Sequence, residues 1–334
     1  MVTIKLLAEQ LHVSVSTVSK ALNDSSEISS ATTRRVKDLA KHYNYHPNRT
    51  AVNLKSSQTK TIGVILPNIL NRFFAKVLFG IEKEATKKGY NIITCISNES
   101  LDKEKESLQL LTHGAVDGFI VAVSEDTQTL GSFDHFNTIL QQGVPIVMFD
   151  RVLNQVPCDK VIIDDFEASC KATDALIQQN RKHIAFITTI DDLNIGKLRE
   201  DGYKKTMMDA VEIHDTSLVL KIQGGEDLHT RIKAFLSNNP QINGVVSADN
   251  ISGTTCINTC ISMGYKVPKD IAVIGFADET ISQLSVPKLS FINQHAEEIG
   301  KNSINLLLDR LSNSNNKEFV TKVIPTTLLH AQSA

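Results

Sequence analysis

Polar and aromatic side chains stand where several short apolar runs of the sequence end. Carboxylates and amides can hydrogen-bond to hydroxyl groups, and an aromatic ring can stack on a sugar or a base. These residue types therefore predict a site that grips a small polar molecule. The candidates are Asn71, Phe73, Phe74, Asp150, Asp164 and Asp249.

Patterns that would indicate catalysis are missing from the sequence. It holds no G-x-S-x-G and no H-E-x-x-H. Cys256 and Cys260 are four residues apart and could clasp a metal, but no histidine or further cysteine joins them at a finger-like spacing, which favours buried packing. We expect no catalytic residue, no metal site and no cofactor, and a protein that is not an enzyme.

Strand-like and helix-like segments alternate from Thr61 onward, and they must position the candidate residues. Expected strands lie in TIGVIL, NIITCI, DGFIVAV and PIVMFD, and then in VIID, HIAFIT, LVLKI, GVVSA and IAVIGF. Expected helices occupy 74–87, 102–113, 129–142, 166–179, 197–211, 227–238 and 250–263. This alternation is typical of parallel sheets wrapped by helices, and the two series predict two similar lobes.

The tail of the chain predicts a return between the lobes. LSFIN, a helix over 296–312 and FVTKVIP follow the second series, and Gln294 lies at the expected crossover. Open α/β sheets bind ligands beyond the carboxyl ends of their strands. The cleft between the two lobes is therefore the expected pocket.

Composition limits the class of protein. A chain of 334 residues with 41% hydrophobic and 22% charged residues is typical of globular proteins with two or three domains. No apolar run approaches the length of a membrane span, and the N-terminus lacks the pattern of a secretory signal. Five scattered cysteines favour a reducing cytoplasm over a disulfide framework. We expect a cytoplasmic protein without a membrane role.

Charge is spread unevenly along the chain. Residues 1–60 carry nine Lys/Arg and four Asp/Glu, whereas the remainder carries 26 and 33. A small basic head on an acidic body indicates a nucleic-acid module joined to a sensing or catalytic domain. Chance fluctuation on a solvated surface is the alternative that charge alone leaves open.

The basic head reads as three short helices. Residues 4–11 and 30–43 are amphipathic, the second of these with Val36, Leu39, Ala40 and Tyr43 on its inner face. Between them, VSVSTVSKALN alternates like a strand at its start and is spaced like a helix at its end. No strand partner lies nearby, so we expect a helix capped by Ser14, and hence a helix-turn-helix.

The outward face of this middle helix suits DNA. Small hydroxyl side chains let a helix enter the major groove, and Val15 offers methyl groups to thymine. An ordinary solvated face is the competing interpretation, although such faces usually carry Glu and Lys.

The sequence of this head and of the segments after it resembles the LacI (lactose-repressor-like) family of bacterial transcription regulators. LAEQLHVSVSTVSKALNDSSEISSATTRRV matches its N-terminal signature, and NYHPNRTAVNLKSSQTKTIGVILP matches the hinge and first strand that follow. The resemblance continues through VPIVMFDR, GYKKTM, GVVSADN and VPKDIAVIGFADE, and so covers essentially the whole chain.

The resemblance implies particular DNA contacts. A hinge segment would fold into a short helix on DNA, with Leu54 as a wedge in the minor groove. The family often has Arg-Ser where this chain has Val52 and Asn53, which puts minor-groove contacts there in doubt. The implied DNA-binding residues are Thr3, Ser14, Val15, Ser16, Thr17, Ser19, Lys20, Asn23, Ser29, Asn48, Arg49, Ala51, Leu54 and Lys55.

The resemblance also adds residues to the cleft. Arg199 matches the family's ligand-gripping arginine, whose fork can hold a carboxylate or vicinal hydroxyls. Ala277 stands where many members have an effector-binding aspartate, and Asp278 is the candidate replacement. The implied effector-binding residues are Asn71, Phe73, Phe74, Asp150, Asp164, Arg199, Asp249, Asp278 and Gln294. For each of them, capping a helix or bridging the lobes is a competing role.

Together these features predict a homodimeric transcriptional repressor that binds a near-palindromic DNA operator and a small effector, a sugar or sugar derivative. The expected architecture is an α/β chain with a helix-turn-helix head and a two-lobed periplasmic-binding-protein type I fold. The expected domains are 1–46, a hinge over 47–60, and 61–334. Within the last, the N-lobe takes about 61–160 and 291–321 and the C-lobe about 161–290 and 322–334. The alternative is a sugar-binding protein or an enzyme with no role on DNA.

Overall fold

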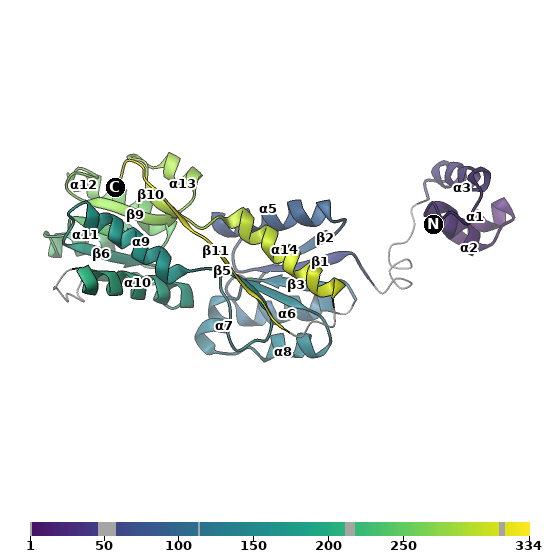
Figure 1. The fold of residues 1–334 in the computed structure, drawn as a ribbon, viewed down its shortest axis with the longest axis horizontal. Coiled ribbons are helices and arrows are strands. Elements are labelled where there is room, and N and C mark those ends of the chain that lie inside the picture. The colour runs from purple at the N-terminus through teal and green to yellow at the C-terminus, as the bar shows by residue number, and fades with distance from the viewer. Residues whose placement is uncertain (1, 46–57, 113, 211–217, 314–317) are drawn as a thin grey trace. The chain divides into compact units, whose positions relative to one another are not determined.

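The computed structural model describes residues 2–45, 58–112, 114–210, 218–313 and 318–334. The chain divides into two compact units, Met1–Thr59 and Lys60–Ala334 (Figure 1). Within the described residues, no helix is long and apolar enough to cross a membrane.

In the part of the first unit that the structure describes, residues 2–45 and 58–59, three helices form a small head. Its helices are α1 (Ile4–Leu11), α2 (Val15–Leu22) and α3 (Ser30–His42). Their inner faces meet in a small core of Leu7, Ala8, Val18, Ala21, Val36 and Ala40. The stretch VSVSTVSKALN is therefore helical, as predicted, because its apolar residues at helical spacing have two neighbouring helices to pack against.

One residue of the head that was predicted to lie in its core does not lie there. Tyr43 ends α3 as its C-cap and is 37% exposed, whereas Tyr45 packs against the core. The helix ends one residue earlier than predicted, so the tyrosine that continues the inner face is supplied by the segment after the helix.

Within the described residues, the second unit contains two sheets of six strands each, wrapped by helices. The N-lobe sheet has the order β11-β5-β4-β3-β1-β2, and the C-lobe sheet has the equivalent order β12-β10-β9-β8-β6-β7. All neighbouring strands are parallel except β10 and β12. The strands are β1 (Thr61–Leu66), β2 (Asn91–Ile96), β3 (Gly118–Val121), β4 (Ile146–Phe149), β5 (Asp159–Ile163), β6 (Ile184–Thr188), β7 (Val219–Lys221), β8 (Gly244–Ser247), β9 (Ala272–Ala277), β10 (Ser290–Asn293), β11 (Thr321–Ile324) and β12 (Thr327–Leu329).

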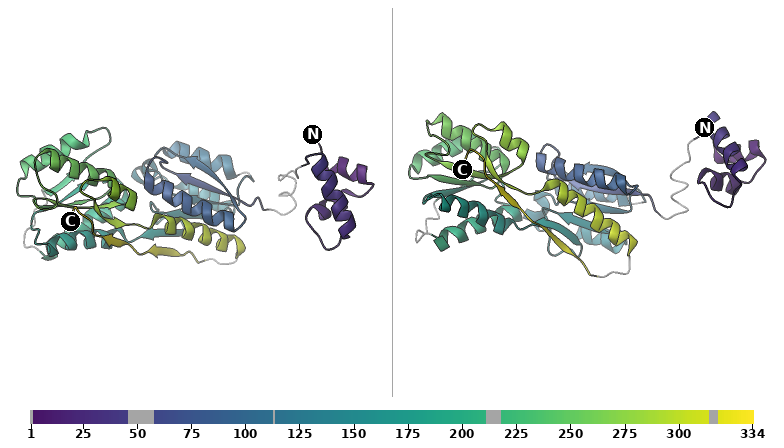
Figure 2. Two further views of the ribbon diagram at one scale, coloured as in Figure 1. Left: turned by 90° about the horizontal axis from the view of Figure 1, so that it is seen from above. Right: turned by 45° about the horizontal axis from the view of Figure 1, so that its top comes forward.

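Helices cover both faces of each sheet. On the N-lobe sheet α5 and α14 pack side by side on one face, as all views show, and α6 and α8 pack together on the other (Figures 1 and 2). On the C-lobe sheet α9 and α10 oppose α11 and α12. These helices are α5 (Arg72–Lys87), α6 (Leu101–Thr112), α7 (Glu125–Leu130), α8 (Asp134–Gln141), α9 (Asp165–Gln178), α10 (Asn194–Ala210), α11 (Leu228–Asn238), α12 (Asn250–Ser262), α13 (Glu279–Leu284) and α14 (Ala296–Ser312).

Three elements differ from the sequence-based prediction. The single helix expected over 129–142 is two helices, because Gly131 ends α7 in the left-handed conformation (φ 61°) that glycine adopts without strain. The short helix α13 and the edge strand β12 were not predicted. Both are too short to show a clear period in the sequence.

The lobe boundaries lie slightly later than predicted. Strand β5 pairs within the N-lobe sheet as far as Ile163, and β10 pairs within the C-lobe sheet as far as Asn293. The last crossing comes after Ile324, where β11 ends and the chain returns to β12. Each crossing follows the end of a strand, and a strand cannot leave its sheet without losing its ladder of hydrogen bonds.

Candidate functional site

Helices α1, α2 and α3 each begin at a hydroxyl residue predicted to contact DNA. Ser14 Oγ accepts a hydrogen bond from the Thr17 amide (3.0 Å) and lies 2.8 Å from Thr17 Oγ1. Thr3 and Ser29 cap α1 and α3 in the same way. Such caps satisfy amides that the first turn leaves unpaired, so these side chains stabilise the helices whatever else they contact.

The exposed face of α2 carries the predicted base-reading residues. Val15 is 41% exposed and Ser16 is exposed, so both are accessible to a partner. Lys20 forms an ion pair with Glu27, and this pair would have to break for Lys20 to reach DNA. The side chain of Asn23 donates to the Ser19 carbonyl oxygen (2.9 Å) at the end of the helix.

Some predicted DNA contacts cannot be placed. Asn48, Arg49, Ala51, Leu54 and Lys55 lie outside the described residues, as do Val52 and Asn53. Their roles on DNA stay predictions.

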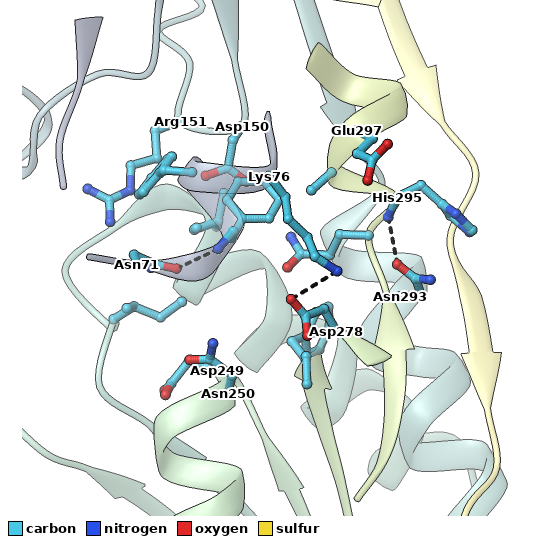
Figure 3. Close-up of a pocket in the computed structure, with 18 of the residues that line it drawn as sticks. Asn71, Lys76, Asp150, Arg151, Asp249, Asn250, Asp278, Asn293, His295 and Glu297 are labelled. Carbon is cyan, nitrogen blue, oxygen red and sulfur yellow. Dashed lines mark hydrogen bonds and ion pairs between the residues drawn. The ribbon is translucent and has the colours of Figure 1, made fainter. Parts of the chain in front are cut away.

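A cavity of about 340 Å³ lies between the two lobes of the second unit (Figure 3). It is lined at the carboxyl ends of β4, β8, β9 and β10 and at the start of α5, α12 and α14. The lining includes these predicted residues: Asn71, Phe73, Phe74, Asp150, Arg199, Asp249, Asp278 and Gln294.

Asp164 was predicted to line this cavity and does not. It is the N-cap of α9, and its Oδ1 accepts a hydrogen bond from the Glu167 amide (2.8 Å). The neighbouring residue Asp165 is the buried one, at 4% exposed, and it faces Arg199. Two consecutive aspartates at a strand end cannot be told apart by spacing, because the turn into the helix decides which one points inward.

Several lining residues were not among the predicted site residues. Arg151 directly follows a predicted residue, and Asn250 and His295 are each next to one, so adjacency in the sequence was a usable signal. Lys76 and Phe276 lie inside a helix and a strand, where the sequence shows only ordinary amphipathic or apolar patterns. The missed polar and aromatic residues include Lys76, Arg151, Asn250, Phe276, Asn293 and His295.

Arg199 lies in the wall of the cavity and is only 3% exposed. Its Nε donates to Asp165 Oδ1 (2.7 Å), its Nη1 donates to the Ala248 carbonyl oxygen (2.7 Å), and its guanidinium group lies 3.9 Å from the centre of the Phe276 ring. Burial raises the pKa of Asp165, and the Arg199 charge and hydrogen bond oppose that rise. The arginine therefore ties together α10, α9 and the end of β8 as well as facing the cavity.

Arg151 is a second buried arginine at the cavity, and it pairs with the partly exposed carboxylate of Glu99. Its Nη1 donates to Glu99 Oε2 (2.6 Å), and its guanidinium group lies 5.2 Å from the centre of the Phe74 ring. Phe74 also contacts Phe73 edge to face, with 5.4 Å between ring centres. Since Phe74 is 1% exposed, it supports the arginine and the neighbouring ring from behind the surface.

Asp150 faces the cavity from the end of β4 and is 5% exposed. Burial and the nearby Asp165 charge raise the pKa of Asp150 to about 6, against the opposing charges of Arg199 and Arg151. Two arginines, Arg151 and Arg199, therefore lie among three carboxylates, which are Asp150 itself, Asp165 and Glu99. The cluster therefore has one more negative than positive charge when Asp150 is ionised.

Asp249 and Asn71 combine lining with helix capping. Asp249 Oδ1 accepts from the Ser252 amide (2.8 Å), and Oδ2 accepts from the hydroxyl groups of Thr189 (2.9 Å) and Ser252 (2.7 Å). Asn71 Oδ1 accepts from the Phe73 amide (3.0 Å). Both side chains are therefore held in fixed orientations at the edge of the cavity before any ligand arrives.

Asp278 bridges the two lobes beside the cavity. Its Oδ2 lies 3.1 Å from Lys76 Nζ and 2.8 Å from Arg72 Nε, both on α5 (Figure 3 draws the first of these contacts). Its Oδ1 caps α13 by accepting from the Ile281 amide (3.0 Å). Ala277, next to it, contributes only a methyl group to the lining.

Comparisons with known proteins cover both units. The family described as bacterial regulatory proteins, lacI family, matches residues 3–48, and a periplasmic binding protein-like domain matches residues 173–333. The transcriptional regulator RegA of Clostridium saccharobutylicum is 32% identical over 93% of this chain and 92% of its own length. The transcriptional repressor PurR of Aliivibrio fischeri is 30% identical (97% and 96%), and the ribose operon repressor of Bacillus subtilis is 31% identical (92% and 91%).

Solved structures agree with this assignment. A LacI family regulator from Enterococcus faecium with bound ribose is 27% identical, with a TM-score of 0.71 over 82% of this chain and 98% of that one. The lac repressor dimer bound to operator has a TM-score of 0.86 over 99% and 98% of the two chains; at 20% identity it supports the fold alone. With its helix-turn-helix head, its two-lobed body and full-length relatives of this kind, the chain belongs to the lacI family of bacterial regulatory proteins and is a DNA-binding transcriptional regulator rather than an enzyme.

Proposed function

We propose that this regulator is a cytoplasmic homodimeric repressor whose effector is a neutral sugar bound in the cavity between the lobes. The observation that carries the proposal is the charge pairing of the cavity wall. Arg151 pairs with Glu99, Arg199 with Asp165, and Lys76 with Asp278.

This pairing argues against an anionic effector. A bound phosphate or carboxylate is normally held by cationic side chains that have no other carboxylate partner. Here each of the three cations already faces a carboxylate of the protein at 2.6–3.1 Å. The lining also contains Asp150 and Asp249, so hydrogen-bond acceptors are abundant. A ligand rich in hydroxyl donors fits such a wall, and a negatively charged one would be repelled.

The volume of the cavity and the names of two similar proteins also support a sugar as the effector. About 340 Å³ lies at the lower end of small-molecule pockets, which favours a ligand of monosaccharide size. A ribose operon repressor is among the relatives, and a structural neighbour contains ribose. Ribose is therefore the first sugar to test.

The head supports a dimer on a near-palindromic operator. One three-helix unit presents a single α2 face and can read one half-site, and two-fold symmetric proteins pair half-sites on symmetric DNA. Val15, Ser16 and Lys20 are the proposed base-reading residues, and Ser14, Thr17 and Asn23 the proposed phosphate contacts. Leu54 is the proposed wedge in the minor groove.

A thermal-shift panel tests the effector class. The full chain is melted with D-ribose, other neutral mono- and disaccharides, ribose 5-phosphate, gluconate and hypoxanthine. A ligand that binds only the native state raises Tm, by an amount equivalent to about 2.7 kcal/mol at a hundred times Kd. We expect neutral sugars to raise Tm; a rise with the phosphate or the acid alone would contradict the proposal.

A pair of variants locates the binding. Asn250 lines the cavity, whereas Asn313 is exposed at the end of α14. Asn250→Ala should weaken the sugar that gives the largest shift about tenfold by calorimetry, the typical effect of losing a hydrogen bond to a buried ligand. Asn313→Ala should leave the affinity unchanged, and equal effects of the two variants would place the sugar elsewhere.

A further inference from the structure

The two lobes of the body are joined by charged contacts as well as by the chain crossings. Arg72 and Lys76 are one turn apart on α5 of the N-lobe, so both side chains project from the same face of that helix. They meet Asp278 at the start of α13 in the C-lobe, at 2.8 Å and 3.1 Å. Arg72 Nη2 also donates to Thr280 Oγ1 (2.7 Å).

The acceptor capacity of Asp278 is committed to these contacts. Oδ1 accepts from the Ile281 amide and thereby holds α13 in place, and Oδ2 faces both cations. The side chain is 15% exposed, whereas Arg72 and Lys76 are 43% and 30% exposed. An inflexible carboxylate anchored on one lobe therefore meets two longer, more mobile cations from the other.

A second contact between the lobes is uncharged. Gln128 Nε2 on α7 donates to Asn194 Oδ1 (3.0 Å) at the start of α10, and Asn194 Nδ2 donates to the Val152 carbonyl oxygen (3.2 Å). Among the described residues, the lobes are thus joined by an ionic contact at Asp278 and by an amide contact at Asn194. Only the ionic contact should respond to dissolved salt, because screening acts on charges.

We propose that Asp278 is an interlobe latch rather than an effector contact: by pairing with Arg72 and Lys76 it holds the two lobes closed beside the cavity. The proposal reassigns a residue that the resemblance placed at the ligand. It does not depend on which effector binds, because the latch acts between two parts of the protein.

The ion pairs of the latch are weak enough for a bound ligand to change the ratio of closed to open lobes. Partly exposed ion pairs each contribute little, so together they should shift the ratio of closed to open lobes about fivefold. A bias of this size can be overridden by a ligand that prefers either state. Closure should weaken as ionic strength rises from about 0.05 M to about 0.5 M, because the screening length falls from about 14 Å to about 4 Å over that range.

The test measures the separation of the lobes by electron-spin distance measurements in the full chain. Nitroxide labels are attached at Lys103→Cys on α6 and Lys233→Cys on α11, both exposed positions, after the partly buried Cys95 and Cys170 are changed to serine. Labelled chains are diluted with unlabelled ones so that each measured pair lies within one chain. Asp278→Asn removes the charge but keeps an N-cap, because asparagine caps helices as well as aspartate does.

We expect Asp278→Asn at low salt to raise the population with longer distances about fivefold relative to the native sequence, and high salt to do the same to the native sequence. Asp227→Asn is the matched control, since Asp227 caps α11 through the Thr230 amide within the C-lobe. Adding Asp278→Asn to the double variant Arg72→Gln/Lys76→Gln should open the lobes no further, because all three groups form one interaction.

Unchanged distances in Asp278→Asn at low salt would overturn the latch, and so would equal opening by Asp227→Asn. If Asp278→Asn fails to fold, as judged by circular dichroism, the double variant Arg72→Gln/Lys76→Gln decides alone, because both residues are partly exposed and cap no helix. A closed, salt-insensitive double variant would then refute the proposal. Failure of every sugar to bind would refute the proposed effector class and leave these distances unaffected.

Discussion

The residues around Asp150 show how a buried carboxylate can be held ready for a ligand. Its backbone is in the left-handed region (φ 56°), which Asp tolerates better than most residues, and its neighbours are two paired arginines. The arginines are not free to collapse onto it, because Glu99 and Asp165 hold them. The native state therefore accepts a poorly compensated charge at the point where a sugar hydroxyl could donate to it.

This arrangement predicts a stability that depends on pH. The pKa of Asp150 is about 6 in the folded chain and near its ordinary value when unfolded. Protonation thus favours the native state, so the contribution of this group is fully present below about pH 4. It is lost as pH rises through about 6, and the loss amounts to about 3 kcal/mol.

Asp150→Asn removes this titration and keeps the shape, and asparagine also tolerates a positive φ. We expect the variant to melt near the native temperature at about pH 4 and clearly above it at about pH 8, measured by calorimetry without ligand. Asp309→Asn, on an exposed turn of α14, is the matched control for the loss of one carboxylate. A difference in Tm that does not grow with pH would show that Asp150 is not the titrating group.

At the scale of elements, close helix packing sets the shape of the N-lobe. Helices α5 and α14 approach so closely that a Cβ on Gly300 would lie 2.1 Å from the Val77 carbonyl oxygen, and one on Gly80 would lie 2.3 Å from that of Glu297. Backbone atoms cannot move aside as a flexible side chain can. These two glycines therefore let the first helix of the lobe and its last long helix share one face of the sheet.

Gly300→Ala should therefore destabilise the protein, although alanine favours an isolated helix by about 1 kcal/mol. Overpacking of this kind costs about 1–3 kcal/mol, so we expect a lower Tm. Lys301→Ala, on the exposed side of the same helix, is the control and should change Tm little. If Gly300→Ala melted at or above the native temperature, the two helices would have to be further apart than the structure places them.

At the scale of the whole molecule, the basic head and the acidic body divide the work. Residues 1–60 carry nine of the 35 Lys/Arg residues and only four Asp/Glu, and the exposed face of α2 lies in this part of the chain. Affinity for DNA should come mainly from phosphates, with discrimination among sequences from the few side chains of α2. The acidic body should add little attraction to DNA.

This division predicts how salt and mutation affect DNA binding. The logarithm of the association constant should fall steeply with the logarithm of salt concentration, by about 0.9 for each neutralised phosphate. Lys20→Gln should reduce the preference for a selected operator over random duplex about tenfold, the typical effect of losing a base contact. Binding is measured by fluorescence anisotropy, with Lys103→Gln on the body as the control. A flat salt dependence would contradict the division of roles.

Much of this organisation followed from local patterns in the sequence. Apolar residues at helical spacing, hydroxyl caps such as Ser14 and runs such as IAVIGF report local preferences, and these survive folding because tertiary packing reinforces them. Resemblance to a family, carried by ordered motifs, placed Arg199 and Asp249 at the cavity. The sequence by itself thus determined the two units, the alternating lobes and most of the wall of the cleft.

Only the tertiary structure decided how charges pair. Arg72 and Asp278 are 206 residues apart, and nothing in the spacing of either residue announces the other. The same holds for Arg199 with Asp165 rather than Asp164, and for Asp278, which bridges the lobes as well as lining the cavity. The physical reason is that an ion pair needs its two charged groups within a specific distance. Folding of the C-lobe brings Arg199 to Asp165, and only the meeting of the two lobes brings Arg72 to Asp278.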